Sequence, residues 1–139
     1  SGKISIYRGN SKIYIIRNKT LTFDETSINE RCNWFDGMIT VSAPQRFNEY
    51  ADKFTASLPE NFDCKVRQWR FSDTYISATH GHRCKVSDLF IDEKLNYIQK
   101  RIQPIVTDSN DTILWIPGLA HASISSADKF KKYSWESSK

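Results

Sequence analysis

The stretch that most constrains the fold spans residues 82–122, because it joins an amphipathic helical pattern to two apolar runs that favour strands. In its first half, residues 85–101, Val86, Leu89 and Phe90 recur at the spacing of one helix face. An apolar helix face must be covered by other apolar side chains. The sequence therefore predicts an amphipathic helix over residues 85–101 that packs against the rest of the chain.

The second half of this stretch predicts a β-hairpin. Residues 104–108 and 112–116 are rich in branched and aromatic side chains, which favour a pleated, half-buried surface. Between them, residues 109–111 read Ser-Asn-Asp, which is typical of a turn, and Pro117-Gly118 ends the second strand. We expect this hairpin to cover the apolar face of the helix.

The rest of the chain favours β-structure. Alternating apolar residues in 3–7 and 12–17, around Gly9-Asn10, predict an amino-terminal hairpin. Further strands are expected at Leu21 and Phe23, at residues 38–42, at residues 64–71 and at residues 129–135. Residues 44–54 carry aromatic side chains at helical spacing, which favours a short helix over an irregular strand, and residues 58–61 are expected to form a loop or linker.

Length and composition indicate one compact domain. The chain has 139 residues, of which 39% are hydrophobic, and this suffices to bury a core. We divide it into a β-rich part, residues 1–60, a helix-plus-hairpin core, residues 61–122, and a basic and aromatic tail, residues 123–139. No run of 18 apolar residues is present, so we expect no membrane span and a cytoplasmic location.

The cysteines do not predict a disulfide framework or a metal site. Cys32, Cys64 and Cys84 are far apart and form no Cys-x-x-Cys pair. His80 and His82 lie close to Cys84, but a fourth ligand for zinc is missing from this pattern. We therefore predict no metal site in this chain.

The segment Cys-Lys-Val-Arg-Gln-Trp-Arg-Phe, residues 64–71, has two interpretations. Arg67 and Arg70 are suited to phosphates and Trp69 to stacking on an exposed base, which would give a nucleic-acid surface. Alternatively, Trp69 belongs to the core and the arginines are solvated strand residues. The net charge of +4 permits binding to nucleic acid without requiring it.

Three segments in order carry a family resemblance. They are Lys-Val-Ser-Asp-Leu-Phe-Ile-Asp at residues 85–92, Pro-Ile-Val at 104–106 and Ile-Leu-Trp-Ile-Pro-Gly-Leu at 113–119. In this order and spacing the chain resembles the C-terminal domain of bacterial tRNA(Ile)-lysidine synthetase. The resemblance implies an α+β fold of layered, mostly antiparallel sheets that includes a β-sandwich, similar also to a module of the phenylalanyl-tRNA synthetase β subunit.

The resemblance also implies a function. The full-length enzyme uses ATP to ligate lysine to the anticodon cytidine of isoleucine tRNA, and its C-terminal domain holds the acceptor stem. Relatives have spaced arginines and then a Gly-Asp-Arg-like turn where this chain has Ser72-Asp73-Thr74, so only Asp73 of that turn is present. The candidate RNA-binding residues are basic: Arg67, Arg70, Arg83, Lys85, Lys100, Arg101, Lys129, Lys131 and Lys132.

The sequence lacks the Ser-Gly-Gly-x-Asp-Ser loop with which this ligase family binds ATP. The resemblance therefore implies that catalysis, ATP and Mg²⁺ belong to a catalytic domain outside these residues, and that this region alone has no catalytic residues and no cofactor. A second hypothesis is a non-catalytic module that docks on that catalytic domain, or forms a homodimer, through Trp69, Trp115 or Trp135. A small hydrolase is the weakest alternative, because no pair of nucleophile and base is recognisable.

Overall fold

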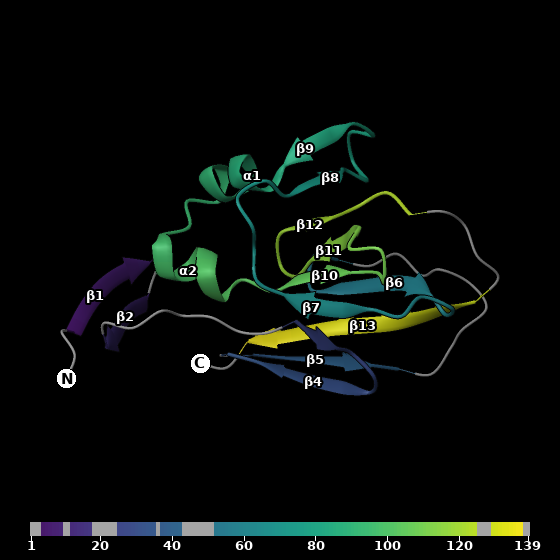
Figure 1. The fold of residues 1–139 in the computed structure, drawn as a ribbon, viewed down its shortest axis with the longest axis horizontal. Coiled ribbons are helices and arrows are strands. Elements are labelled where there is room, and N and C mark those ends of the chain that lie inside the picture. The colour runs from purple at the N-terminus through teal and green to yellow at the C-terminus, as the bar shows by residue number, and fades with distance from the viewer. Residues whose placement is uncertain are drawn as a thin grey trace.

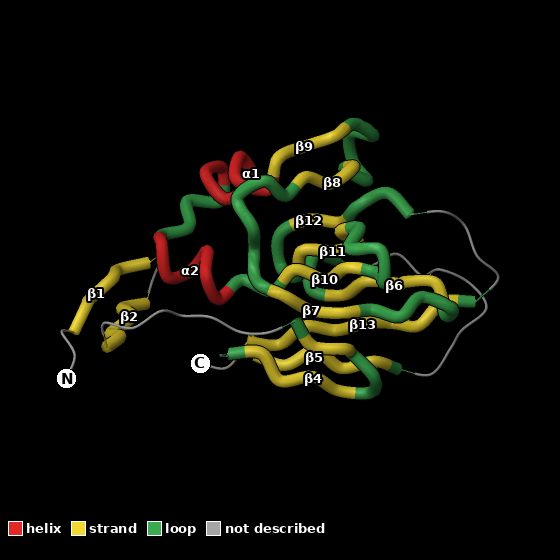
Figure 2. Tube along the Cα trace, viewed as in Figure 1, coloured by secondary structure: helices red, strands yellow, loops and turns green. Residues whose placement is uncertain are grey.

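The computed structural model describes residues 25–35, 37–42, 52–124 and 129–137, and the backbone of residues 4–9 and 12–17 (Figure 1). The strand expected at Leu21 and Phe23 and most of the helix expected over residues 44–54 lie outside the described residues. Strands predominate, and the helical segments gather at one side of the molecule (Figure 2). In the described residues, no helix has the length and apolar character needed to cross a membrane.

One layer is a four-stranded antiparallel sheet with the order β4-β5-β13-β6. Its strands are β4 (Arg31–Trp34), β5 (Gly37–Val41), β13 (Phe130–Ser137) and β6 (Thr55–Pro59). The strands predicted near residues 38–42 and 129–135 are confirmed. The tail thus supplies a strand that lies between β5 and β6, so segments from both halves of the described chain share one sheet.

The loop expected at residues 58–61 is wrong for its first half, because Leu58 and Pro59 belong to β6. Alternate residues Ala56 and Leu58 are buried, which is the pattern of a strand with one face on the core. Pro59 is tolerated because β6 is an edge strand, where a missing N–H donor leaves no unpaired partner inside the sheet.

The second layer is a five-stranded antiparallel sheet with the order β12-β11-β10-β7-β3. It consists of β12 (Ala120–His121), β11 (Ile113–Ile116), β10 (Ile105–Thr107), β7 (Lys65–Arg67) and β3 (Thr26–Ser27). The predicted hairpin is confirmed as β10 and β11. The strand expected over residues 64–71 is shorter than predicted and ends at Arg67.

The two sheets pack face to face and form the β-sandwich implied by the resemblance. Trp34, Ile39 and Tyr133 of the four-stranded sheet share a buried cluster with Val106 and Trp115 of the five-stranded sheet. A register shift between β10 and β11 puts two successive residues of β11, Leu114 and Trp115, into this same cluster. The bulge therefore adds a large aromatic side chain to the core between the sheets.

A third layer covers the outer face of the five-stranded sheet. It contains helix α1 (Val86–Asp92) and the small hairpin of β8 (Thr74–Ile76) and β9 (Arg83–Lys85). Val86 and Phe90 are fully buried and share a second cluster with Ile105 and Ile116 of the sheet. The prediction that the hairpin covers the apolar helix face is confirmed.

The prediction of one helix over residues 85–101 is wrong, because the chain forms α1 and then a separate helix, α2 (Tyr97–Ile102). Lys94 has a φ of 58°, which is incompatible with a continuous helix. Asn96 then caps α2: its side chain accepts from the Gln99 amide at 2.8 Å, and the Gln99 side chain accepts from the Asn96 amide at 2.8 Å. This capping box therefore starts a new helix.

The predicted amino-terminal hairpin is confirmed as β1 (Ile4–Gly9) and β2 (Lys12–Arg17), which pair antiparallel. These strands form a two-stranded sheet of their own and lie beside α2, at one end of the sandwich (Figure 1).

Candidate functional site

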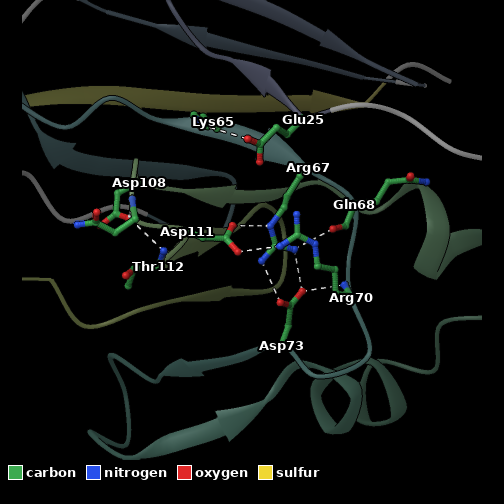
Figure 3. A network of polar contacts seen from close by, with 10 residues as sticks. Glu25, Lys65, Arg67, Gln68, Arg70, Asp73, Asp108, Asp111 and Thr112 are labelled. Carbon is green, nitrogen blue, oxygen red and sulfur yellow. Dashed lines mark hydrogen bonds and ion pairs between the residues drawn. The ribbon is translucent and has the colours of Figure 1, made fainter.

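The polar centre of the molecule is a network formed by Arg67, Arg70, Asp73 and Asp111, which we call the arginine–aspartate network (Figure 3). Arg67 stands at the end of β7 with only 3% of its side chain exposed. Its two terminal nitrogens donate to the two carboxylate oxygens of Asp73, both at 2.9 Å, and its Nε donates to Asp111 at 2.8 Å. A further bond from Nη1 to the Gln68 carbonyl leaves this guanidinium almost saturated.

The turn between β10 and β11 carries Asp111 into the network. Asp108 organises this turn, because its carboxylate accepts from the amides of Asn110 at 2.9 Å and Thr112 at 3.0 Å (Figure 3). Asp111 has a φ of 63°, a left-handed conformation that aspartate tolerates better than most residues. The predicted turn therefore has a second role, since it presents a carboxylate to two arginines.

The charges of the network shift the pKa values of two of its members. Burial alone would lower the pKa of Arg67, but its hydrogen bonds to Asp73 and Asp111 and their charges raise it overall. Burial alone would likewise raise the pKa of Asp111, yet Arg67 and Arg70 together lower it below its ordinary value. Arg67 and Asp111 are therefore both ionised at neutral pH.

Arg70 differs from Arg67 because its side chain is 57% exposed. Its Nη1 donates to the second carboxylate oxygen of Asp111 at 2.8 Å, and its backbone amide donates to Asp73 at 2.8 Å. The guanidinium is thus held at one side and open to solvent on the other. It is the member of the network that is placed to meet an external anion.

Arg83 and Lys85 lie next to this network, on β9. Lys85 lies opposite Thr74 in the backbone pairing of the β8–β9 hairpin. The Arg83 guanidinium donates to the Thr74 hydroxyl at 2.8 Å. Both side chains are exposed, and neither forms an ion pair with another described residue. We call Arg70, Arg83 and Lys85 the basic edge.

Two other predicted residues, Lys100 and Arg101, lie in the last turn of α2 and are half-buried. The Gln68 side-chain amide donates to the Arg101 carbonyl at 2.9 Å, which ties the end of α2 to the chain just after β7. Gln68 is two residues from Arg70, so this bond places the end of α2 near the segment that leads to Arg70.

The three predicted lysines of the tail lie elsewhere. Lys131 and Lys132 are on β13 and Lys129 directly precedes it; Lys131 is half-buried and the other two are exposed. Because β13 begins at the end of the sandwich farther from α2, these lysines do not join the basic edge (Figure 1). The structure therefore divides the nine predicted residues between two regions.

The tryptophans proposed as docking residues belong to the core. Trp115 and Trp135 are buried in the cluster between the sheets. Trp69 is half-buried and packs on the second cluster, with its ring 5.3 Å from that of Phe90. The core interpretation is confirmed for Trp69, but its expectation of solvated arginines is wrong for Arg67, which is buried between two carboxylates. Docking through Trp115 or Trp135 is wrong because both side chains are buried and neither offers a surface to a partner.

The described residues contain no group of three or more histidine, cysteine or acidic side chains that could hold a metal ion. Cys32 and Cys64 are buried free thiols, and burial raises the pKa of each. His80 and His82 stack with ring centroids 5.5 Å apart, and the Cys84 sulfur lies 3.7 Å from Nδ1 of His82.

Comparison with known proteins connects this arrangement to one family. No protein-family model matches the chain. A tRNA(Ile)-lysidine synthase from Geobacillus kaustophilus is 27% identical in an alignment covering 86% of this chain and 29% of that protein. The enzyme of the same name from Bacillus subtilis is 54% identical over 35 residues, which are 25% of this chain and 7% of that protein.

A solved structure provides the corresponding fold. A crystal structure of the TilS C-terminal domain superimposes with a TM-score of 0.65 and 19% identity, covering 73% of this chain and 85% of that one. The chain resembles the C-terminal domain of tRNA(Ile)-lysidine synthetase in sequence and in fold. It spans less than a third of the length of the curated relatives that it matches.

Sequence reasoning identified the arginines of this site but missed Asp111 and Phe71. Asp111 is read from sequence as a turn residue, and nothing local indicates that it meets Arg67, which lies 44 residues earlier. The alternating pattern predicts a strand that includes Phe71, whereas the structure places this residue in a turn with 82% of its surface exposed. Ser72 and Asp73, which are residue types that favour turns, are the local signal for that turn.

Proposed function

We propose that this chain is the tRNA-binding C-terminal domain of a tRNA(Ile)-lysidine synthetase, and that it holds the acceptor stem of isoleucine tRNA. The observation that carries the proposal is the similarity to such enzymes along 86% of the chain, together with the matching fold. The basic edge adds physical support, since it places exposed cationic side chains on one side of a rigid scaffold.

Stem RNA suits a surface of this kind. The major groove of an A-form helix is too narrow for side chains to read, so proteins contact the phosphates and 2′-hydroxyls. Arg70, Arg83 and Lys85, with Lys100 and Arg101 in the last turn of α2, would supply such contacts without a base-specific motif. Lys129, Lys131 and Lys132 would form a second, separate region of phosphate contact.

Arg67 has a different part in this proposal. Its buried guanidinium is occupied by Asp73 and Asp111, so it would act by positioning the turn that holds Arg70 instead of touching a phosphate. Contacts between this domain and the acceptor stem would be remote from the reaction, and such contacts add binding energy that holds the reacting part of a substrate in place. In the full-length enzyme, the ATP- and Mg²⁺-dependent ligation of lysine would take place in a separate catalytic domain, in the cytoplasm.

A second candidate function is docking of this domain on its own catalytic domain. It is favoured by two exposed apolar side chains on neighbouring helices, Ile91 on α1 and Tyr97 on α2, which are 66% and 59% exposed. The same surface could instead form a homodimer, and sedimentation of the isolated chain would reveal that dimer.

Binding of this chain to isoleucine tRNA and to a minihelix of its acceptor stem, over a series of salt concentrations, tests the proposal. We expect both RNAs to bind, with affinity that falls steeply as salt rises. Replacement of Arg83 or Lys85 by alanine should lower affinity and reduce the salt slope by roughly 0.7–0.9 for each phosphate that is no longer neutralised. Lys65→Ala, whose lysine pairs with Glu25 at 3.3 Å, is the control. Failure of both RNAs to bind at low salt would leave docking as the better account.

A further inference from the structure

Phe71 is the most exposed large apolar side chain in the described part of the chain, with 82% of its surface in solvent. It lies in the tight turn between β7 and β8. This turn is closed twice, because the Asp73 amide donates to the Arg70 carbonyl at 2.9 Å and the Arg70 amide donates to the Asp73 carboxylate at 2.8 Å. Asp73 is in turn fixed by the buried Arg67. A rigid backbone therefore presents this ring to solvent.

The ring itself is also supported. Phe71 packs edge to face on Trp69, with centroids 6.2 Å apart and planes inclined by 61°. Trp69 meets Phe90 in the same way, at 5.3 Å and 65°, and Phe90 is fully buried. These three residues form an aromatic series that starts in the core and ends at the surface. Contact with Trp69 along one side orders the ring of Phe71 without covering it. Little conformational entropy of this side chain is therefore lost when a flat ligand stacks on the ring.

Three basic residues lie near the turn that carries Phe71. Arg70 precedes it directly, and the Asp73 carbonyl accepts from the Val86 amide at 3.1 Å, which brings the turn against the end of β9. Arg83 and Lys85 on β9 are thus near neighbours of the turn. An exposed aromatic ring among cations is the combination with which proteins hold single-stranded nucleic acid, in which bases stack and phosphates pair with basic residues.

We propose that Phe71 is a stacking platform for an unpaired nucleobase, which it holds while the basic edge contacts the neighbouring phosphates. This inference rests on the proposed RNA-binding function and deepens it by naming the part of the RNA that is touched. Bases within a stem are already stacked on their neighbours, so only an unpaired nucleotide can offer a free face. The single-stranded 3′ end next to an acceptor stem provides such nucleotides.

The test compares two minihelices of the acceptor stem, one with its unpaired 3′ nucleotides and one with a blunt end, at one low salt concentration. Phe71→Leu keeps an apolar side chain but removes the aromatic face, whereas Phe71→Tyr keeps the face. Phe54→Leu makes the same change at another phenylalanine, which is 55% exposed, and serves as the control. We expect Phe71→Leu to weaken binding of the tailed minihelix roughly 5- to 150-fold, and Phe71→Tyr and Phe54→Leu to leave it nearly unchanged.

The blunt minihelix separates the two proposals. Under our inference it binds the wild-type chain more weakly than the tailed RNA does, and Phe71→Leu does not weaken it further. If both RNAs bind equally and Phe71→Leu has no effect, the stacking inference fails while RNA binding by the domain stands. If neither RNA binds the wild-type chain, the proposed function itself fails. If instead Phe71→Leu leaves RNA binding unchanged but impairs association with the catalytic domain, Phe71 is a protein contact and the inference is overturned.

Discussion

Replacement of Arg67 by methionine should destabilise the fold more than any other change of one charged residue in the arginine–aspartate network. Methionine fills much of the same space but leaves the Asp73 carboxylate, whose side chain is 9% exposed, without its two guanidinium bonds. Removing one partner of a buried ion pair costs about 3–5 kcal/mol, because an uncompensated charge remains inside. Asp111 adds little to this loss, since it is 45% exposed and keeps Arg70.

The measurement is urea unfolding at neutral pH for Arg67→Met, Asp73→Asn and the double variant. We expect the free energy of unfolding to fall by about 3–5 kcal/mol for Arg67→Met, a large share of the roughly 5–15 kcal/mol of a typical domain. The double variant should lose clearly less than the sum of the single losses, because it no longer buries a lone carboxylate. Lys65→Met breaks an exposed pair with Glu25 and should cost no more than about 1 kcal/mol.

Two results would refute this reasoning. A loss below about 1 kcal/mol for Arg67→Met would mean that water reaches Asp73 and that the pair behaves as a surface salt bridge. Strict additivity in the double variant would mean that Arg67 stabilises the fold by packing alone.

Local geometry supports three further predictions. Gly37→Ala should unfold the chain or lower its stability by several kcal/mol in thermal melts, because a Cβ there would overlap the Trp135 ring, which is part of the core. The lowered pKa of Asp111 means that its carboxylate stabilises the fold above about pH 4, and that this stabilisation is lost as the pH falls further. Asn tolerates the same backbone conformation, so Asp111→Asn should remove this contribution alone. In denaturation measured against pH, the stability of the variant should fall less steeply below about pH 4 than that of the wild type. Asn96→Ala should cost about 1 kcal/mol in urea unfolding by removing the cap of α2, and an unchanged midpoint would contradict it.

Strand pairing with strong local signals could be predicted from sequence. The hairpin of β10 and β11 has β-forming runs on both sides of a turn, and β13 interleaves aromatic and basic residues at short spacing. By contrast, β6 was missed because Pro59 is a breaker in isolation. Only the pairing of β6 with β13 makes it an edge strand, and that partner is more than 70 residues away.

The break between α1 and α2 was encoded locally but outweighed by periodicity. Apolar spacing favours one long helix, whereas the Asn96 to Gln99 capping box specifies a new start. In this chain the capping box, not the apolar spacing, marks where the second helix begins. The burial of Arg67, by contrast, has no local signal, because strand alternation shows only that it lies on one face of β7. Its burial depends on a sheet that is covered on both faces and on Asp111 from a distant turn.

The two arginines of the network differ because Asp111 serves both of them. One carboxylate oxygen accepts from the buried Arg67 and the other from the exposed Arg70, so a single turn residue couples the interior of the sheet to the surface. Asp111 neutralises part of the charge that Arg70 would offer to a phosphate, but it also fixes where that charge stands. A guanidinium that is already ordered loses less entropy when it binds an anion than a free one does. The same four side chains therefore stabilise the fold and orient Arg70 at the basic edge.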